Sequence, residues 1–405
     1  MSALKIHDHT RDRYHALAIS SVWELAKVRK ARALVIGAGA LGNEVCKNLA
    51  MMGVRLVVVL DRDTVEAANL SRSIFFRESD HGRPKAEVIL ERLHDVNPDV
   101  ELHSLDGDLD EVLGLGVVRR MDMVFSCLDS RMARRSVNRM CEKLGKPWVD
   151  GAMENLLGEV AAYLPGEGPC YECSLTHAEK LLIAQAASCR GIAIQNLAMG
   201  KVPTTSTMGS IISALEVQEA VKILHGDFLK SLVGKRLVVD CNVNEFYVTT
   251  SSRREDCEGH FRYDAITEVA DFTAASTSAQ DLLLRFQQDT GKEGFLRLGR
   301  EIVIALACGK CGERETLSQL LGKVTEEMVL CPKCGSVRRL ETTNFVRGTE
   351  PYAEWPLSRL GIPLLDVLEV RGVGVTKWYE LTGDLASYPA SLQEAEAGDT
   401  VAKSA

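Results

Sequence analysis

The sequence predicts an α/β protein in which a doubly wound domain with a parallel sheet, residues 1–262, is followed by a smaller α+β domain. Two observations support this fold class. Short apolar runs alternate with segments of helical spacing from residue 33 to residue 249. Beyond residue 300, two Cys-x-x-Cys pairs interrupt a stretch with strand-like alternation, which is typical of a zinc ribbon within a β-rich domain.

The composition excludes several function classes. The chain has 405 residues, of which 46 % are hydrophobic and 26 % charged, enough for two or three separate cores. Its net charge of −8 argues against a broad nucleic-acid-binding face, and no apolar run reaches the roughly 18 residues of a membrane span. The first twenty residues lack a signal-peptide pattern. We therefore expect a cytoplasmic protein whose twelve cysteines serve as thiols and metal ligands rather than as disulfides.

The first domain is expected to begin with a strand, a loop and a helix. Residues 33–36 form a buried strand, a glycine-rich stretch follows at residues 37–42, and residues 43–52 have helical spacing up to Gly53. The strand at residues 56–60 completes a βαβ unit. The same reasoning predicts strands at 99–105, 121–127, 147–150, 158–164 (an antiparallel edge), 236–239 and 245–249, and helices at 83–96, 129–144 and 209–224.

The rest of the chain is expected to form a linker, a small domain and a tail. Residues 272–280 are small and polar, which predicts a linker over residues 263–280. Residues 385–405 are rich in Ala, Ser and Glu without a core pattern, which predicts a disordered tail. The domain between them covers residues 281–384, with strands expected at 281–286, 301–307, 364–370 and 377–381.

A nucleotide site is expected where the glycine-rich loop meets the first helix. Gly37, Gly39 and Gly42 would let the backbone approach phosphates at a helix N-terminus, and Asp61 follows at the distance at which an acid accepts ribose hydroxyls. Nicotinamide and flavin enzymes share this pattern. Cations beyond the second strand and a carboxylate at the sheet edge favour a triphosphate with Mg²⁺ instead. They lie in Asn69-Leu-Ser-Arg72, Gly82-Arg-Pro-Lys85 and Cys127-Leu-Asp129.

These motifs, in this order and spacing, resemble the ThiF/MoeB/HesA family, which includes the activating enzymes of ubiquitin-like proteins. The resemblance covers about residues 12–260. It implies a Rossmann-like fold, a homodimer, and ATP-dependent adenylation of the C-terminal glycine of a ubiquitin-like protein. By position it implies that the glycine-rich loop and Asp61 hold the nucleotide, with Asp61 on the ribose, that Asn69, Arg72 and Lys85 hold the phosphates, and that Asp129 holds Mg²⁺. One motif departs from the pattern: Ala16 stands where members often carry an arginine that reaches the partner's ATP.

Cys189 is the candidate nucleophile. Family members that pass their cargo on as a thioester carry a cysteine at about this place, here within the segment 174–202. Acyl adenylates are attacked readily by thiolates, and the neighbouring Arg190 would lower the pKa of the thiol. The alternative is a small buried hydrophobic side chain.

Two zinc sites are expected. Cys308, Cys311, Cys331 and Cys334 form two Cys-x-x-Cys pairs separated by 19 residues, the spacing of a four-cysteine zinc ribbon. The resemblance implies that the pair Cys170 and Cys173 is closed by ligands after the last strands of the first domain, and Cys257 and His260 stand there. A rival arrangement closes this site with one of the downstream pairs.

The function expected from these features is that of an activating enzyme, which forms an adenylate, then a thioester on Cys189, and then transfers its cargo to a conjugating enzyme. Residues 356–381 resemble, weakly, the close of the ubiquitin-fold domain that docks conjugating enzymes in eukaryotic-type members. Two alternatives stay open. One is a sulfur-carrier adenylyltransferase of cofactor synthesis, and the other is a zinc-binding scaffold with an inactive nucleotide fold.

Overall fold

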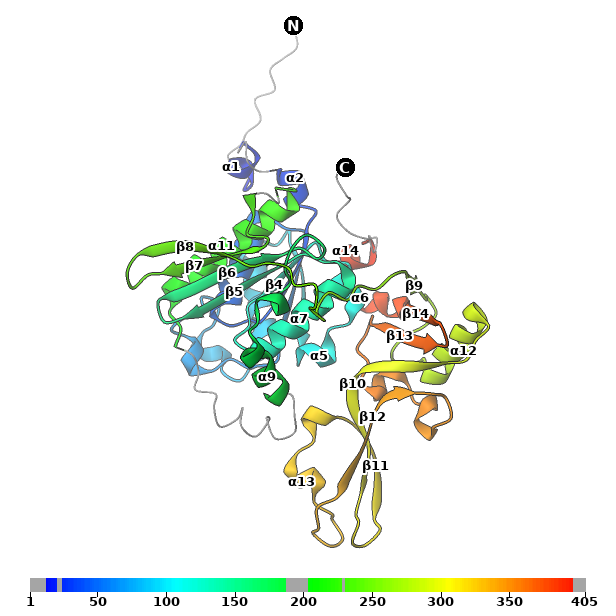
Figure 1. Cartoon of the computed structure of the whole chain (residues 1–405). Coiled ribbons are helices and arrows are strands. Elements are labelled where there is room, and N and C mark those ends of the chain that lie inside the picture. The colour runs from blue at the N-terminus through cyan, green and yellow to red at the C-terminus, as the bar shows by residue number, and fades with distance from the viewer. Residues whose placement is uncertain (1–11, 20–23, 187–202, 228–229, 396–405) are drawn as a thin grey trace.

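The computed structural model describes residues 12–19, 24–186, 203–227 and 230–395, and these residues are built around two β-sheets (Figure 1). The larger sheet has eight strands in the order β3-β2-β1-β4-β5-β6-β7-β8. The first five strands of the chain run parallel, and β6, β7 and β8 continue the sheet antiparallel. The predicted doubly wound arrangement is thereby confirmed. Its strands are β1 (Arg32–Ile36), β2 (Leu56–Asp61), β3 (Glu101–Asp106), β4 (Met123–Ser126), β5 (Trp148–Glu154), β6 (Leu157–Tyr163), β7 (Lys235–Asp240) and β8 (Glu245–Thr250).

The parallel strands read as continuous apolar runs because helices cover both of their faces. In β2, Val57 and Val59 belong to one core and Val58 and Leu60 to the other. The first core is closed by α3 (Ala40–Met52), α4 (Lys85–Val96) and α11 (Ser206–Leu224). The second is closed by α5 (Leu109–Val112), α6 (Leu115–Arg119), α7 (Arg131–Leu144) and α8 (Tyr171–Ser174). The short α2 (Leu25–Val28) adds Val28 to the first core, and the remaining helices of this domain are the short α1 (His15–Ala18) and the peripheral α9 (His177–Ala186).

The strand expected at residues 158–164 lies inside the sheet and not at its edge. This strand, β6, pairs with β5 on one side and with β7 on the other, both antiparallel. The edge is formed by β8, whose six residues are all exposed. The weak alternation of β6 reflects burial, because four of its seven residues, Val160–Tyr163, are buried in succession.

The smaller sheet has the order β11-β10-β13-β14-β9, with β12 also paired to β10. Its strands are β9 (Ile266–Glu268), β10 (Gly294–Ala307), β11 (Arg314–Leu320), β12 (Arg339–Val346), β13 (Val367–Gly372) and β14 (Val375–Glu380), and α13 (Glu326–Val329) and α14 (Ala390–Gln393) are the short helices of this half. All of its pairings are antiparallel except that of β14 with β9. It is therefore a second mixed sheet, and its likeness to a ubiquitin fold stays a prediction.

The strand expected at residues 281–286 is wrong, because this stretch lies in the helix α12 (Ala279–Thr290). Ser278 caps the helix, and its hydroxyl accepts a hydrogen bond from the backbone N–H of Asp281 while the Asp281 carboxylate accepts one from Ser278. The apolar side chains Leu282, Leu283 and Phe286 have helical spacing and are buried against the smaller sheet. The capping box was the sequence signal that distinguishes this helix from a strand.

The expected linker and tail are both packed into the structure where it describes them. The linker at residues 263–280 supplies β9, and Tyr263 within it stacks on Trp378 with ring centroids 5.1 Å apart. Of the expected tail, residues 385–395 include α14, and Tyr388 and Leu392 are buried. Residues 396–405 lie outside the described part. Composition alone wrongly predicted disorder for residues 385–395, because a few apolar side chains are enough to order a segment that packs on an existing core.

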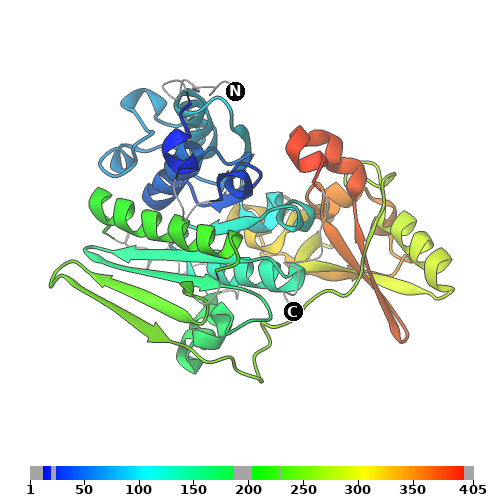
Figure 2. The ribbon, with the colours of Figure 1, turned by 90° about the horizontal axis from the view of Figure 1, so that it is seen from above.

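The second domain lies beside the larger one (Figure 2) and adds side chains to one of its two cores. Leu365, Val367, Trp378, Tyr388 and Leu392 share one core with residues of β1, β2 and α6. The two domains therefore pack through a continuous apolar interface rather than being joined by a polar linker alone.

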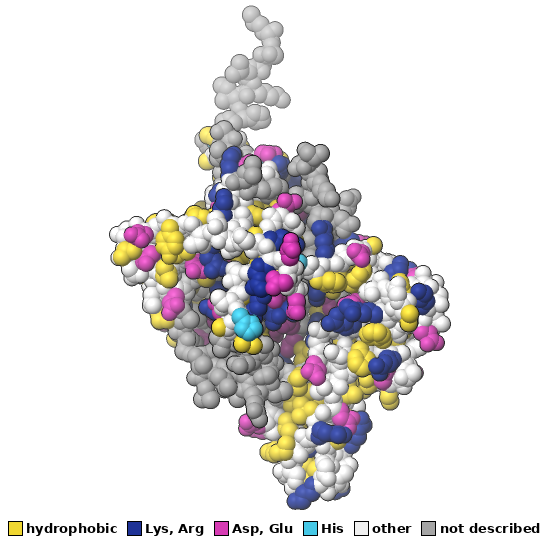
Figure 3. Space-filling view, viewed as in Figure 1, with side chains coloured by type: hydrophobic (Ala, Val, Ile, Leu, Met, Phe, Trp, Pro, Cys, Tyr) yellow, Lys and Arg dark blue, Asp and Glu magenta, His cyan; other side chains and the backbone are white. Residues whose placement is uncertain are grey.

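Two further observations concern the surface. On the face shown in Figure 3, Lys and Arg side chains are interspersed with Asp and Glu. In the part of the chain that the structure describes, no helix is long and apolar enough to cross a membrane.

Candidate functional site

The candidate nucleotide site lies where the strand order reverses. β1 pairs with β2 on one side and with β4 on the other, so the loops that follow β1 and β4 leave the sheet in opposite directions. Ligands of open α/β sheets bind in the crevice formed at such a point, outside the carboxyl ends of the strands. The glycine-rich loop follows β1, and Cys127 and Asp129 follow β4.

The three glycines of the loop have different roles. Gly37 has a φ of 101°, and a Cβ there would lie 2.5 Å from the carbonyl oxygen of Cys127. A Cβ at Gly42 would collide with the carbonyl of Gly37, so this position allows the helix to pack onto the loop. A Cβ at Gly39, by contrast, would meet nothing within 4 Å. Gly39 also caps α3 without a side-chain hydrogen bond, which leaves the N-terminus of α3 open to a ligand.

Asp61 ends β2 and faces the same loop. Its carboxylate accepts hydrogen bonds from the backbone N–H of Ala38, at 2.5 Å, and of Asp63, at 2.7 Å. Burial raises the pKa of Asp61, and these two N–H groups and the charge of Lys85 oppose the shift. The carboxylate is thus held beside the glycine-rich loop.

Lys85 is the first residue of α4 and points to the end of β2. Its Nζ lies 2.9 Å from a carboxylate oxygen of Asp63, and the backbone N–H of Lys85 donates to the backbone carbonyl of Asp63 at 3.0 Å. Only 9 % of the Lys85 side chain is exposed, whereas 60 % of Asp63 is. The ammonium is therefore kept at the crevice by a partner that solvent, or a phosphate, can replace.

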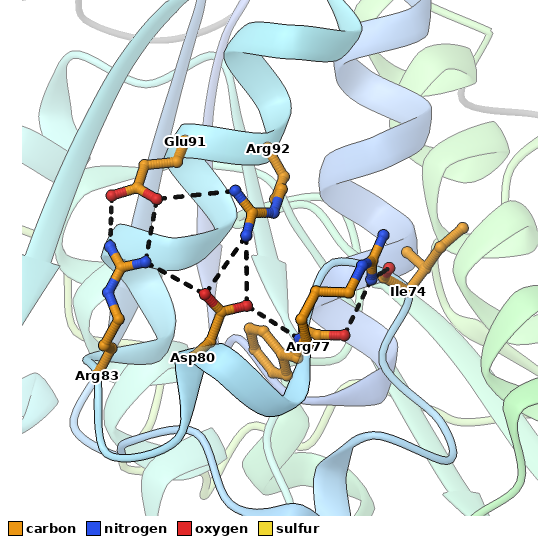
Figure 4. A network of polar contacts seen from close by, with 7 residues as sticks. Ile74, Arg77, Asp80, Arg83, Glu91 and Arg92 are labelled. Carbon is orange, nitrogen blue, oxygen red and sulfur yellow. Dashed lines mark hydrogen bonds and ion pairs between the residues drawn. The ribbon is translucent and has the colours of Figure 1, made fainter.

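The loop between β2 and α4 is braced by a buried carboxylate (Figure 4). Asp80 is 2 % exposed and accepts hydrogen bonds from the backbone N–H of Arg77 and from the guanidinium groups of Arg83 and Arg92. Arg83 also pairs with Glu91. The cation of Arg83 is therefore used by the fold, although it belongs to the motif that the sequence analysis singled out.

Asn69 and Arg72 differ in what they already bind. The side-chain oxygen of Asn69 accepts a hydrogen bond from the backbone N–H of Glu66, so this buried amide fixes the turn. The side chain of Arg72 makes no hydrogen bond or ion pair with the described residues, and the residue is half-buried. It is the cation of this loop that remains available for a ligand.

Asp129 is exposed in the loop between β4 and α7 and accepts no hydrogen bond from the described residues. The next residue, Ser130, caps α7 by accepting the N–H of Ala133, at 3.4 Å. A free carboxylate at the carboxyl end of β4 can hold a hard cation such as Mg²⁺. The fit to Mg²⁺ rests on this donor, because Asp61 is engaged with backbone N–H groups.

The floor of the crevice holds buried charges that sequence reasoning missed. Asp150 in β5 accepts a hydrogen bond from Ser126 and pairs with Arg134 at 3.2 Å. Glu216 in α11 is completely buried, and neither of its oxygens has a hydrogen-bond partner. Burial and the charge of Asp150 raise the pKa of Glu216 well above its usual value. The sequence signal was an acid on the face of α11 that also carries the buried Ile212 and Ala220.

The predicted nucleophile Cys189, with its neighbour Arg190, lies outside the described residues, and so does most of the segment 174–202. Arg13, which precedes Ala16 in the departing motif, donates a hydrogen bond to the carbonyl of Val96.

The first zinc-type cluster comes together as predicted from Cys170, Cys173, Cys257 and His260. Cys170 Sγ lies 3.9 Å from Cys173 Sγ and 3.7 Å from Cys257 Sγ, and His260 Nε2 lies 3.2 Å from Cys173 Sγ. Sulfurs arranged tetrahedrally at about 2.3 Å from zinc are roughly 3.8 Å apart, so this donor set fits Zn²⁺. Glu172, between the two cysteines, binds Arg135 and Arg139 and ties the cluster to α7.

The second cluster unites Cys308, Cys311, Cys331 and Cys334 at the tip of β10, β11 and β12. The Sγ of Cys308 lies 3.5 Å from that of Cys334, and the Sγ of Cys311 lies 3.6 Å from that of Cys331. Both knuckles continue to a glycine of positive φ, Gly312 at 74° and Gly335 at 67°, whose N–H donates to the first cysteine's carbonyl. Backbone N–H groups of Cys311 and Lys310 lower the pKa of Cys308, whereas the pKa of Cys311 is raised. The rival arrangement that shared a downstream pair with Cys170 is wrong.

Comparison with known proteins places the larger domain in a family. The sequence model of the ThiF family matches residues 12–259. Ubiquitin-like modifier-activating enzyme 5 of Dictyostelium discoideum is 29 % identical over 228 residues, which are 53 % of this chain and 58 % of that protein. The sulfur carrier protein adenylyltransferase of Thermus thermophilus is 33 % identical over 236 residues, 57 % of this chain and 82 % of that protein.

Other relatives are covered less fully. SUMO-activating enzyme subunit uba-2 of Caenorhabditis elegans is 35 % identical over 148 residues, 36 % of this chain and 25 % of that protein. This chain therefore spans less than two thirds of the length of the Dictyostelium discoideum and Caenorhabditis elegans relatives. A crystal structure of MccB from E. coli with bound ATP is 22 % identical, has a TM-score of 0.48, and aligns over 58 % of this chain and 68 % of that one.

Proposed function

The chain belongs to the ThiF family, and on that premise we propose that it uses ATP to adenylate the C-terminal glycine of a ubiquitin-like protein. The observation that carries the proposal is the pair of unpartnered charges, Arg72 and Asp129, on the two sides of the open glycine-rich loop. A structural ion pair would satisfy both groups within the fold. Groups that stay free at a topological switch point instead match a substrate that brings phosphates and a cation.

In the proposed first step, a carboxylate oxygen of the C-terminal glycine attacks the α-phosphorus of ATP. The bond from this phosphorus to the bridging oxygen breaks, and pyrophosphate leaves. Arg72 and Lys85 would neutralise the charge that builds up on the phosphates. Mg²⁺ held at Asp129 would supply further positive charge there. Asp63 would release Lys85 to the incoming phosphates, since it is exposed to solvent and bound to Lys85 by one ion pair.

In the proposed second step, the Sγ of Cys189 attacks the carbonyl carbon of the adenylate. The thiol proton passes to solvent, AMP leaves, and a thioester remains. Transfer to a thiol of a conjugating enzyme would follow, with the second domain as its docking element. The zinc clusters would be structural, because each already offers four protein ligands and leaves no position open for a substrate.

A second candidate is a sulfur-carrier adenylyltransferase, in which the adenylate is converted to a thiocarboxylate. One relative supports it: the chain spans 82 % of the Thermus thermophilus sulfur carrier protein adenylyltransferase, although it also spans 86 % of the SAMP-activating enzyme E1 of Haloferax volcanii. Both candidates share the first step and differ in what attacks the adenylate.

The test is ATP–pyrophosphate exchange in the presence of a purified ubiquitin-like protein that ends in glycine. Exchange is expected with wild type and is expected to fall at least about 100-fold in Arg72→Ala, which removes an anion-binding side chain. Arg77→Ala, in the same loop but exposed, is the matched control and should retain exchange. No exchange with any such protein would support the inactive scaffold instead.

The two candidates separate at Cys189. In a thioester-forming enzyme, Cys189→Ala keeps pyrophosphate exchange but loses a hydroxylamine-sensitive adduct with the ubiquitin-like protein. Formation of a thiocarboxylate by the wild type, in the presence of a sulfur donor and without that adduct, would select the sulfur-carrier reaction.

A further inference from the structure

The cation of Arg134 lies next to the loop that carries Asp129, and the proposed first step gives it no role. Arg134 belongs to the first turn of α7, and only 13 % of its side chain is exposed. Its Nη2 donates hydrogen bonds to two backbone carbonyls, that of Leu128, directly before Asp129, and that of Gly151 in β5, the latter at 3.4 Å. Its Nε lies 3.2 Å from a carboxylate oxygen of Asp150.

These contacts extend the connection between β4 and β5 beyond the end of their pairing. The register of the two strands ends at Ser126 opposite Asp150. Leu128 and Gly151 lie just past that pair, where the loop after β4 leaves the sheet while β5 continues beside β6. Arg134 bridges the two carbonyls at this point. The strands are thus paired without the guanidinium, which adds an anchor for the departing loop.

Asp129 lies between two anchored residues although its own carboxylate is exposed. On one side, the Leu128 carbonyl is held by Arg134. On the other side, Ser130 caps α7 by accepting the backbone N–H of Ala133. Asp129 is also close enough for its charge to act on the guanidinium of Arg134. A carboxylate that must meet a cation at a defined place needs a fixed backbone, and these two anchors supply one.

A buried ion pair alone does not account for this arrangement. Asp150 already accepts a hydrogen bond from the Ser126 hydroxyl at 2.8 Å. The Nε of Arg134 has no hydrogen-bond partner among the described residues, so its attraction to Asp150 is one of charge without an aligned hydrogen bond. Apolar side chains can replace such buried pairs without loss of stability. The hydrogen bonds of the guanidinium go to the carbonyls of Leu128 and Gly151, and these depend on its planar shape.

We propose that Arg134 is a positioning residue for adenylation, which binds the Leu128 carbonyl and thereby fixes the loop from which Asp129 holds Mg²⁺. This inference rests on the proposed function, in which Asp129 is the residue that holds the metal ion. Arg134 touches neither the nucleotide nor the metal in this role and acts only through Asp129. A lysine in its place would keep a positive charge near Asp150, but a single ammonium cannot reproduce the guanidinium's contacts with both carbonyls.

Thermal unfolding of the full chain with ATP, over a range of Mg²⁺ concentrations and in EDTA, tests this inference without turnover. For wild type, we expect ATP to raise the Tm more in Mg²⁺ than in EDTA. Arg134→Lys should need about tenfold more Mg²⁺ for half of this effect, as is typical when the support of a metal ligand is removed. Arg131→Gln is the matched control. Arg131 is on the same turn of α7 and pairs with Glu179, so this variant should respond as wild type does.

ATP–pyrophosphate exchange supplies a second measurement. A residue that acts only through Asp129 matters little once that carboxylate is gone. The double variant Asp129→Ala, Arg134→Lys should therefore exchange within about threefold of Asp129→Ala alone, although Arg134→Lys by itself lowers exchange. Losses that multiply in the double variant would show that Arg134 acts independently of Asp129 and would overturn the proposal.

A second variant separates positioning from stability. Arg134→Met combined with Asp150→Asn removes both charges of the buried pair, so it should fold about as well as wild type and still need about tenfold more Mg²⁺. This variant decides the matter if Arg134→Lys does not fold. A Mg²⁺ requirement equal to that of wild type in either folded variant would overturn the proposal and leave the proposed function standing. A wild type that shows neither an effect of ATP on the Tm nor pyrophosphate exchange would overturn the proposed function, and this inference with it.

Discussion

Charged side chains gather both in the crevice at the carboxyl edge of the larger sheet and at the interface between the two domains. This interface, called the seam below, is where α6 meets residues 364–366 and Glu380. The two regions differ in whether their charges have partners within the fold. In the crevice, Arg72 and Asp129 have no partner among the described residues, and Asp129 is exposed. In the seam, Glu380 is completely buried and is bound by both Arg119 and Arg120. The comparison teaches that a charge satisfied within the fold is structural, whereas one left free at an open edge is available for a ligand.

At the seam, the backbone of the smaller domain packs directly against α6 of the larger domain. The backbone N–H of Gly116 donates to the carbonyl of Leu365, and a Cβ at Gly114 would lie 2.1 Å from the carbonyl of Leu364. The N–H of Leu115 is bound by Asp366. α6 thus approaches the second domain as closely as neighbouring elements do within one core, which a freely swinging arm would not allow.

The largest expected effect comes from deleting the second domain. Removal of residues 263–405 would expose the core that Leu365, Val367 and Trp378 help to close, so we expect the remaining domain to aggregate or to lose its cooperative unfolding transition. Calorimetry and solubility after expression measure this. A soluble fragment 1–262 with a sharp transition and full pyrophosphate exchange would show that the seam is dispensable.

Breaking the buried ion pairs of the seam is expected to have the next largest effect. Glu380→Ala leaves the guanidinium groups of Arg119 and Arg120 without their buried partner, which should cost about 3–5 kcal/mol of the free energy of unfolding. Glu268→Ala is the control, because Glu268 contacts Arg119 but is 47 % exposed, so the loss should stay below about 1 kcal/mol. Chemical denaturation of the three proteins compares these free energies. Equal losses in both variants would contradict the distinction.

In the crevice, the effect should fall on activity and not on stability. Asp129→Ala should lower pyrophosphate exchange about 100- to 1000-fold while the Tm stays within about 1 °C of wild type, because the carboxylate is exposed and bonds to no described residue. Asp106→Ala is the matched control: this exposed acid ends β3, the edge strand of the same sheet, and its removal should leave exchange unchanged. A loss of stability in Asp129→Ala would mean that this carboxylate is structural.

Much of this contrast could be predicted from the sequence, because glycine spacing, apolar runs and cysteine spacing act locally. The loop at Gly37, its position between β1 and α3, and the composition of both cysteine clusters all follow from such patterns. The seam could not be predicted. Glu380 lies 260 residues from Arg120, and no local pattern marks which buried acid will meet which arginine.

The smallest expected effect concerns Glu216, a buried acid beneath the crevice. It is neither exposed like Asp129 nor paired with an arginine like Glu380. Its raised pKa means that the folded protein holds a proton on Glu216 at pH values where the unfolded chain, near its usual value, has released it. This group therefore supports folding below about pH 4 and loses that contribution as the pH rises toward its folded pKa. Glu216→Gln keeps the shape and is neutral throughout, so its gain in stability over wild type should be larger at pH 7 than at pH 5. Glu219→Gln, on the same helix, should instead be destabilised, because Glu219 accepts a hydrogen bond from the N–H of Leu232 and pairs with Lys222. Calorimetry from pH 5 to pH 8 measures both differences, and a stability gain in Glu216→Gln that does not grow with pH would show that Glu216 is not held in its protonated form.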